Sequence, residues 1–211
     1  MARVKLSEVS KPSNHGIDPE NLSIEQRLAS GFILLDKPPG PTSHQIASWV
    51  RDLLGLDRLG HGGTLDPFAT GVLPLMAGKS MKLTKGILKT DKTYIAVLKF
   101  ANETSNATLS DVISKLTGRI YNVPPEISAV KVQVRTRKIY SFEVIEASGK
   151  QAIVKITCEA GTYIRTIARD MGLLLGYKVE LKELRRENSG RFDLADLSLI
   201  HISEPTRRQQ I

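Results

Sequence analysis

Cysteine and aromatic residues are scarce in this sequence. Of its 211 residues one is cysteine, Cys158, and 5% are aromatic. A single cysteine excludes an intramolecular disulfide and a cysteine-rich zinc site. Cys158 lies in the alternating apolar stretch AIVKITCEAG (152–161), so we expect a buried structural thiol rather than a nucleophile.

Long apolar runs are absent, and no pair of histidines has metal-binding spacing. No run of 18 apolar residues occurs, and the first 16 residues are polar, so neither a membrane-spanning helix nor a secretory signal is predicted. We therefore expect a cytoplasmic protein that does not enter membranes. The four histidines form no pair at helical spacing, so we predict no metal site.

Acidic residues are outnumbered by basic ones. The sequence has 30 Lys and Arg against 22 Asp and Glu, a net charge of +8. This balance favours a polyanionic partner such as nucleic acid, and a solvated basic surface is the alternative. Lys79, Lys82, Lys85, Lys89 and Lys92 are spaced by three or four residues, and the first four would share one side of a helix. Such a row is either a solvated face or a contact for a phosphate backbone.

Hydrophobic periodicity predicts a mixture of strands and helices. We expect helices in 23–30, 42–55, 107–118 and 162–176, and strands in 31–40, 92–100, 127–135, 151–161 and 179–192. Residues 71–89 read as a strand followed by a short helix, and 136–149 have a mixed pattern. Because strands and helices do not alternate regularly, we predict an α+β fold with a largely antiparallel sheet flanked by helices and loops.

The ordered pattern defines three segments of the chain. Residues 31–197 form the predicted domain, and residues 1–30 are a polar N-terminal extension. The stretch LIHISEPTRRQQI (199–211) matches no preceding element. We expect residues 198–211 to be an unstructured, non-native tail, with a natural disordered terminus as the alternative.

One glycine-rich stretch holds a solitary acid. In GHGGTLDPFATG (60–71), Asp66 is the only acidic residue between Asp57 and Asp91. Asp-Pro often initiates a turn, so a purely structural interpretation is open. A carboxylate isolated in a basic chain is also a candidate for catalysis.

Six separated motifs of this chain occur together, and in this order, in one enzyme family. They are LLDKPPGPTSH (34–44), GHGGTLDPFATGVLP (60–74), DKTYIAVLKF (91–100), PPEISAVKVQVRTRKIY (124–140), CEAGTYIRTIARDMG (158–172) and ELRRENSGRF (183–192). Over residues 31–197 the chain resembles the TruB and dyskerin-type pseudouridine synthases. The stretch CEAGTYIR and the leader GIDPENLSIEQRLASGFILLDKP resemble the archaeal and eukaryotic branch.

This resemblance implies an enzyme that isomerises uridine within RNA without a cofactor. Asp66 matches the essential aspartate, which attacks C1′ or removes a sugar proton. Arg165 would pair with that carboxylate, because its planar fork suits one. Tyr94 would stack on the flipped uracil near C5, whereas without the resemblance it reads as an inward-facing strand aromatic.

The resemblance also assigns residues that would bind the substrate. Tyr163 would face the same pocket, and Leu184 would line it. His61 matches a histidine near the gap that the flipped base leaves. Lys37 and Pro38 match a motif that braces the tyrosine segment.

Two RNA substrates are compatible with the resemblance. One is uridine 55 of the tRNA T loop, and the other is rRNA uridine chosen by H/ACA guide RNA. The branch resemblance favours guided modification with proteins of the Nop-ten, Gar-one and L-seven-Ae type.

The family continues into a C-terminal RNA-binding PUA domain, which we expect this chain to lack. The competing interpretation is a basic RNA-binding or chaperone module without catalysis; a metal-dependent nuclease would need several carboxylates.

Overall fold

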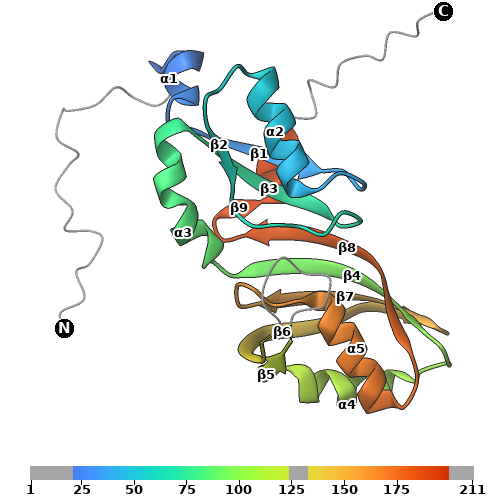
Figure 1. The fold of residues 1–211 in the computed structure, drawn as a ribbon. Helices are drawn as coiled ribbons and strands as arrows, with labels where there is room; N and C mark the ends of the chain where they lie inside the picture. Colours follow the sequence, from blue (N-terminus) through green and yellow to red (C-terminus); the bar gives the residue numbers. More distant parts are fainter. Residues whose placement is uncertain (1–20, 124–132, 200–211) are drawn as a thin grey trace, which may run out of the picture.

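A computed structural model describes residues 21–123 and 133–199, in which nine strands form one sheet (Figure 1). The strands are β1 (Phe32–Lys37), β2 (Leu59–His61), β3 (Thr70–Ala77), β4 (Lys92–Phe100), β5 (Gly118–Asn122), β6 (Arg135–Ser148), β7 (Gln151–Cys158), β8 (Val179–Ser189) and β9 (Phe192–Asp193). Their order is β1-β3-β8-β4-β7-β6-β5, with β2 on β3 and β9 on β8. Among these pairs only β3 and β8 are parallel, which confirms the predicted α+β fold.

Helices cover the two ends of this sheet. They are α1 (Ile24–Leu28), α2 (Ser43–Leu53), η3 (Gly78–Leu83), α3 (Thr84–Leu88), α4 (Asn106–Leu116), α5 (Ile164–Leu175) and η4 (Leu194–Leu199), where η marks a 3-10 helix. In Figure 1, α2 lies at the end formed by β1 to β3, and α4 and α5 lie at the end formed by β5 to β7. None of the helices in the described ranges has the length and apolar character needed to span a membrane.

The helices α4 and α5 follow their sequence patterns. The four residues predicted to face inward on α4 are all buried: Leu109, Val112, Ile113 and Leu116. Helix α5 ends at Gly176, whose φ of 76° is a left-handed conformation that glycine adopts without steric cost. The expectation for Cys158 is also confirmed, because its side chain is fully buried and burial raises its pKa to about 12.

The predicted inward face of α2 is partly wrong. Ile46 is buried against Leu73 and Leu75 of β3, as expected. However, Trp49 is 59% exposed and Leu53 is 83% exposed. The helix contacts the sheet along a narrower stripe than its apolar residues occupy, and periodicity alone does not give the width of that stripe.

The predicted helical row of lysines is also wrong. Lys79 and Lys82 lie on η3, Lys85 lies on α3, and Lys89 follows α3. The two helices have different numbers of residues per turn, so the row does not follow one helix face. These four lysines are exposed, but Lys92 is buried in β4.

Some strands were not expected from the sequence, and the longest of them are β5 and β6. The mixed segment 136–149 lies almost entirely in the 14-residue strand β6, and β5 was not expected. Pairing of β6 with β7 shifts register between Ile139 and Ser141 and between Val144 and Glu146. Such irregularities interrupt the alternation by which a strand is recognised.

Three predictions concern residues outside the described ranges. They are residues 127–132 of a predicted strand, most of the N-terminal extension, and nearly all of the predicted tail.

Gly71→Ala is expected to destabilise the protein by about 2–4 kcal/mol. Gly71 has a φ of 104° and pairs with Arg186 where β3 meets β8, and a Cβ there would lie 2.7 Å from the Arg186 backbone nitrogen. Urea unfolding would measure the loss. The control is Gly149→Ala, because Gly149 also has a positive φ (57°) but no atom within 4 Å of the added Cβ. Equal losses in both variants would contradict the role assigned to the close strand approach.

Candidate active site

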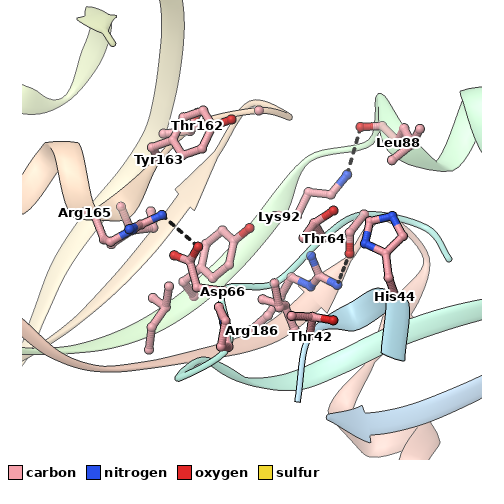
Figure 2. A pocket seen from close by; sticks show the side chains of 17 residues that line it. Thr42, His44, Thr64, Asp66, Leu88, Lys92, Thr162, Tyr163, Arg165 and Arg186 are labelled. Carbon is pink, nitrogen blue, oxygen red and sulfur yellow. Dashed lines mark hydrogen bonds and ion pairs between the residues drawn. The ribbon is translucent and has the colours of Figure 1, made fainter. Parts of the chain in front are cut away.

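A pocket of about 440 Å³ lies over the central strands β4 and β8 (Figure 2). Six parts of the chain line it: the beginning of α2, the loop between β2 and β3, the end of α3, strand β4, the segment that leads into α5, and strand β8. The side chains labelled in Figure 2 are Thr42, His44, Thr64, Asp66, Leu88, Lys92, Thr162, Tyr163, Arg165 and Arg186. The pocket therefore gathers residues from nearly the whole described length of the chain.

Asp66 and Arg165 form an ion pair at this pocket. The Arg165 Nη2 donates to the Asp66 Oδ1 at 2.8 Å, across 99 residues of sequence. The two side chains are 28% and 32% exposed, so the pair remains partly in contact with solvent. The structure thus brings together the two residues that the family resemblance had paired.

Buried polar contacts hold the Asp66 loop in place. The Ser43 hydroxyl, fully buried at the start of α2, accepts from the Leu65 N–H at 2.9 Å and is 3.3 Å from the Leu65 carbonyl oxygen. After Asp66, the Pro67 carbonyl accepts from the Gly40 N–H at 2.9 Å. The loop is therefore fixed on both sides of the carboxylate, to the first residue of α2 and to the segment that precedes it.

Lys37 holds the same loop through hydrogen bonds. It is fully buried, and its Nζ donates to the carbonyl oxygens of Pro38, Pro67 and Ala69 at 2.9–3.0 Å. Burial lowers the pKa of Lys37, and the Asp66 charge opposes that effect. The resemblance implied that Lys37 and Pro38 brace the tyrosine segment. The hydrogen bonds of Lys37 brace the Asp66 loop, and the brace of the tyrosine segment by Lys37 and Pro38 stays a prediction.

Strand β5 holds the beginning of α5. The Asn122 side chain accepts from the Tyr163 N–H at 2.9 Å and donates to the Tyr163 carbonyl at 3.3 Å. One turn later, the Thr166 hydroxyl donates to the Val123 carbonyl at 2.7 Å. Asn122 is 1% exposed, so water competes little for these hydrogen bonds. This clamp fixes the first turn, which carries Arg165.

Tyr94 and Leu184 line the pocket from β4 and β8, and Tyr163 lines it from the start of α5. Tyr94 is 9% exposed, and burial raises the pKa of its hydroxyl, so the phenol is neutral at pH 7. The sequence prediction that these three residues share a pocket with Asp66 agrees with their positions. Their roles toward a substrate remain a prediction.

His61 is not among the residues that line the pocket. Its ring packs edge-on against His44, which does line the pocket, with 4.6 Å between ring centroids. Burial above all, with smaller effects of the neighbouring His44 and Arg186, lowers the pKa of His61 to about 4, so His61 is neutral at pH 7. His44 is thus the nearer of the two histidines to any ligand bound in the pocket, and its place there was not predicted from the sequence.

Two buried cations of the pocket were also missed. Lys92 and Arg186 are 5% and 1% exposed. Side chains two residues apart in a strand point to the same face of the sheet. The sequence could therefore have revealed Lys92 from its spacing to Tyr94, and Arg186 from its spacing to Leu184. Among the described residues that line the pocket, Asp66 alone carries a carboxylate. No cluster of three potential metal ligands occurs in residues 21–123 and 133–199.

Comparison with known proteins identifies relatives over most of the chain. The family model for the TruB family pseudouridylate synthase N-terminal domain matches residues 51–164, and that of the DKCLD (NUC011) domain matches residues 4–47. A protein named "Probable tRNA pseudouridine synthase B" from Pyrobaculum calidifontis is 45% identical over 87% of this chain and 55% of its own. Its namesake from Methanothermobacter thermautotrophicus is 38% identical over 94% of this chain and 61% of its own. The chain therefore spans little more than half the length of these relatives.

Solved structures show the same fold. A Cbf5-Nop10-Gar1 complex superimposes with a TM-score of 0.82 and 40% identity, over 88% of this chain and 57% of that one. An H/ACA RNP bound to a substrate RNA containing 2′-deoxyuridine gives a TM-score of 0.75 and 36% identity, over 85% of this chain and 56% of that one. Because the first family model alone covers more than half of the sequence, the chain belongs to the TruB family of pseudouridylate synthases.

Proposed function

We propose that this chain carries the catalytic site of an RNA pseudouridine synthase, which isomerises uridine to pseudouridine. The observation that supports this most directly is the Asp66–Arg165 pair beside Tyr94 in one pocket. Membership of the family and the order of the motifs agree with the proposal. The proposed reaction needs no cofactor.

The geometry of Asp66 suits the proposed chemistry. Arg165 binds only Oδ1, and no described residue donates a hydrogen bond to Oδ2. Oδ2 is therefore available to attack C1′ of the target nucleotide or to remove a sugar proton. Arg165 stabilises the ionised form of the carboxylate, and Tyr94 provides a face on which uracil can stack.

The substrate that we propose is a uridine selected by H/ACA guide RNA, and uridine 55 of tRNA is the second candidate. Relatives of this chain include the Cbf5 of complexes with Nop10, Gar1 and substrate RNA, and proteins named tRNA pseudouridine synthase B. We propose the corresponding proteins, with one of the L-seven-Ae type, as partners. The exposed lysines Lys79, Lys82, Lys85 and Lys89 are suited to contact an RNA backbone.

Tritium release from RNA labelled at uridine C5 tests this proposal. The purified chain would be incubated with a tRNA transcript alone, and with guide RNA, rRNA target and the partner proteins. Release only in the guided reaction supports our choice, and release from tRNA alone supports the second candidate. Binding of RNA with no release in either reaction would instead favour the non-catalytic RNA-binding module.

Tyr94→Phe is expected to bind RNA as well as the wild type and to turn over slowly, whereas Tyr94→Ala should lose both properties. Phenylalanine keeps the stacking face, worth ~1–3 kcal/mol per base, and lacks only the hydroxyl. Filter binding and single-turnover kinetics measure the two effects separately. Full turnover by the Phe variant would show that the hydroxyl has no chemical role.

A further inference from the structure

Arg186 is a buried cation without a carboxylate partner among the described residues. Its Nε donates to the Val72 carbonyl at 2.8 Å, and its Nη2 donates to the Gly63 carbonyl at 3.1 Å. Burial lowers the pKa of Arg186, because the charged guanidinium loses hydration free energy in the interior. A neutral residue could fill the space at a smaller cost, so the retained charge calls for a functional explanation.

Arg186 and Tyr94 are neighbours across two strands of the pocket. The two residues are directly paired across β4 and β8, and both line the pocket. Each side chain shifts the pKa of the other, so the guanidinium and the phenol interact electrostatically. Because the carbonyls of Val72 and Gly63 anchor the guanidinium, the position of this donor is fixed.

The chemistry of arginine determines the direction of any hydrogen bond between the two side chains. A guanidinium donates and cannot accept, so the Tyr94 oxygen must be the acceptor. The phenol proton then cannot point at Arg186. No described side chain or carbonyl accepts a hydrogen bond from the Tyr94 hydroxyl, which leaves this proton for a ligand in the pocket.

We propose that Arg186 is a positioning residue that directs the Tyr94 hydroxyl toward the bound nucleotide, as a hydrogen-bond donor. Arg186 acts through Tyr94 and does not itself contact the substrate. The inference rests on the function proposed above, and it assigns Arg186 a part in that reaction. It also explains why an uncompensated cation lies beside the tyrosine.

A double-mutant cycle between Arg186 and Tyr94 tests the proposal. Arg186→Gln should lower turnover roughly 10–100-fold, the worth of a hydrogen bond to a charged group. In the Tyr94→Phe background the same substitution should cause no further loss, because the hydroxyl is already absent. Losses that multiply in the double variant would overturn the proposal. If Arg186→Gln does not fold, Arg186→Lys, which loses the planar fork, is judged by the same comparison.

The neighbouring residue offers a matched control. Arg185 binds Asp36 through two hydrogen bonds of 2.6 and 3.1 Å, and it does not line the pocket. Arg185→Gln should reduce stability, and any effect on turnover should be the same in the wild-type background and in the Tyr94→Phe background. A general effect of removing an arginine from β8 is thereby separated from a specific effect on Tyr94.

A measurement on the RNA-free protein makes the inference independent of activity. The Tyr94 ¹³Cζ signal is identified by its loss in Tyr94→Phe. Arg186→Gln should shift this signal more than the signals of the other four tyrosines, since the phenol oxygen loses its donor. An unchanged signal would overturn the inference even if the chain makes pseudouridine. Absence of pseudouridine with a shifted signal would contradict the proposed function alone.

Discussion

Asp66→Asn is expected to abolish turnover and to leave the melting temperature and RNA affinity close to wild type. The substitution is isosteric, and the amide oxygen can still accept from Arg165 at the position where Oδ1 now lies, 2.8 Å from Nη2. It removes the negative charge and replaces the free carboxylate oxygen by an amide NH₂, which is neither a nucleophile nor a base. Tritium release and thermal melting measure the two properties.

The control for this variant is another carboxylate-to-amide change. Asp111 lies on α4, is paired with Lys115 at 2.7 Å, and does not line the pocket. Asp111→Asn should retain wild-type turnover. Residual activity of Asp66→Asn above a tenth of wild type would refute the assignment of Asp66 as the catalytic carboxylate.

Arg165→Met should reduce turnover severely with only a small change in stability. Without the guanidinium, Asp66 loses the donor that orients Oδ1 and the charge that favours its ionised form. Both side chains are about 30% exposed, so water still solvates the isolated carboxylate. The loss in unfolding free energy should therefore be about 1 kcal/mol, well below the cost of breaking a fully buried pair.

The helix that carries Arg165 also provides its control. Arg169 lies one turn further along α5, is 56% exposed and pairs with Asp170. Arg169→Met should leave turnover unchanged, and Arg165→Lys should recover part of it, because lysine keeps the charge but not the planar fork. Kinetics of Arg165→Met equal to wild type would show that the ion pair has no part in the reaction.

Hydrophobic periodicity predicted the elements whose formation depends mainly on residues close together in the sequence. Helices α4 and α5 were found because their apolar residues repeat at the helical period and face one core. Prediction failed where long-range pairing interferes, as in β6, where register shifts hide the alternation. It failed again on α2, where Trp49 is exposed because the sheet covers a narrower stripe of the helix than its apolar residues occupy.

The sequence by itself determined the candidate carboxylate, since Asp66 stands alone in a glycine-rich loop, and through its motifs it determined the family. The motifs also implied Arg165 as the partner of that carboxylate, but the contact itself is made by the tertiary structure. Arg165 is 99 residues away, and only the packing of α5 beside the loop brings the two within 2.8 Å. Likewise, the pairing of Arg186 with Tyr94 depends on the register of β8 against β4. Residue types and spacing report local preference, whereas contacts between distant segments depend on how strands pair and helices pack.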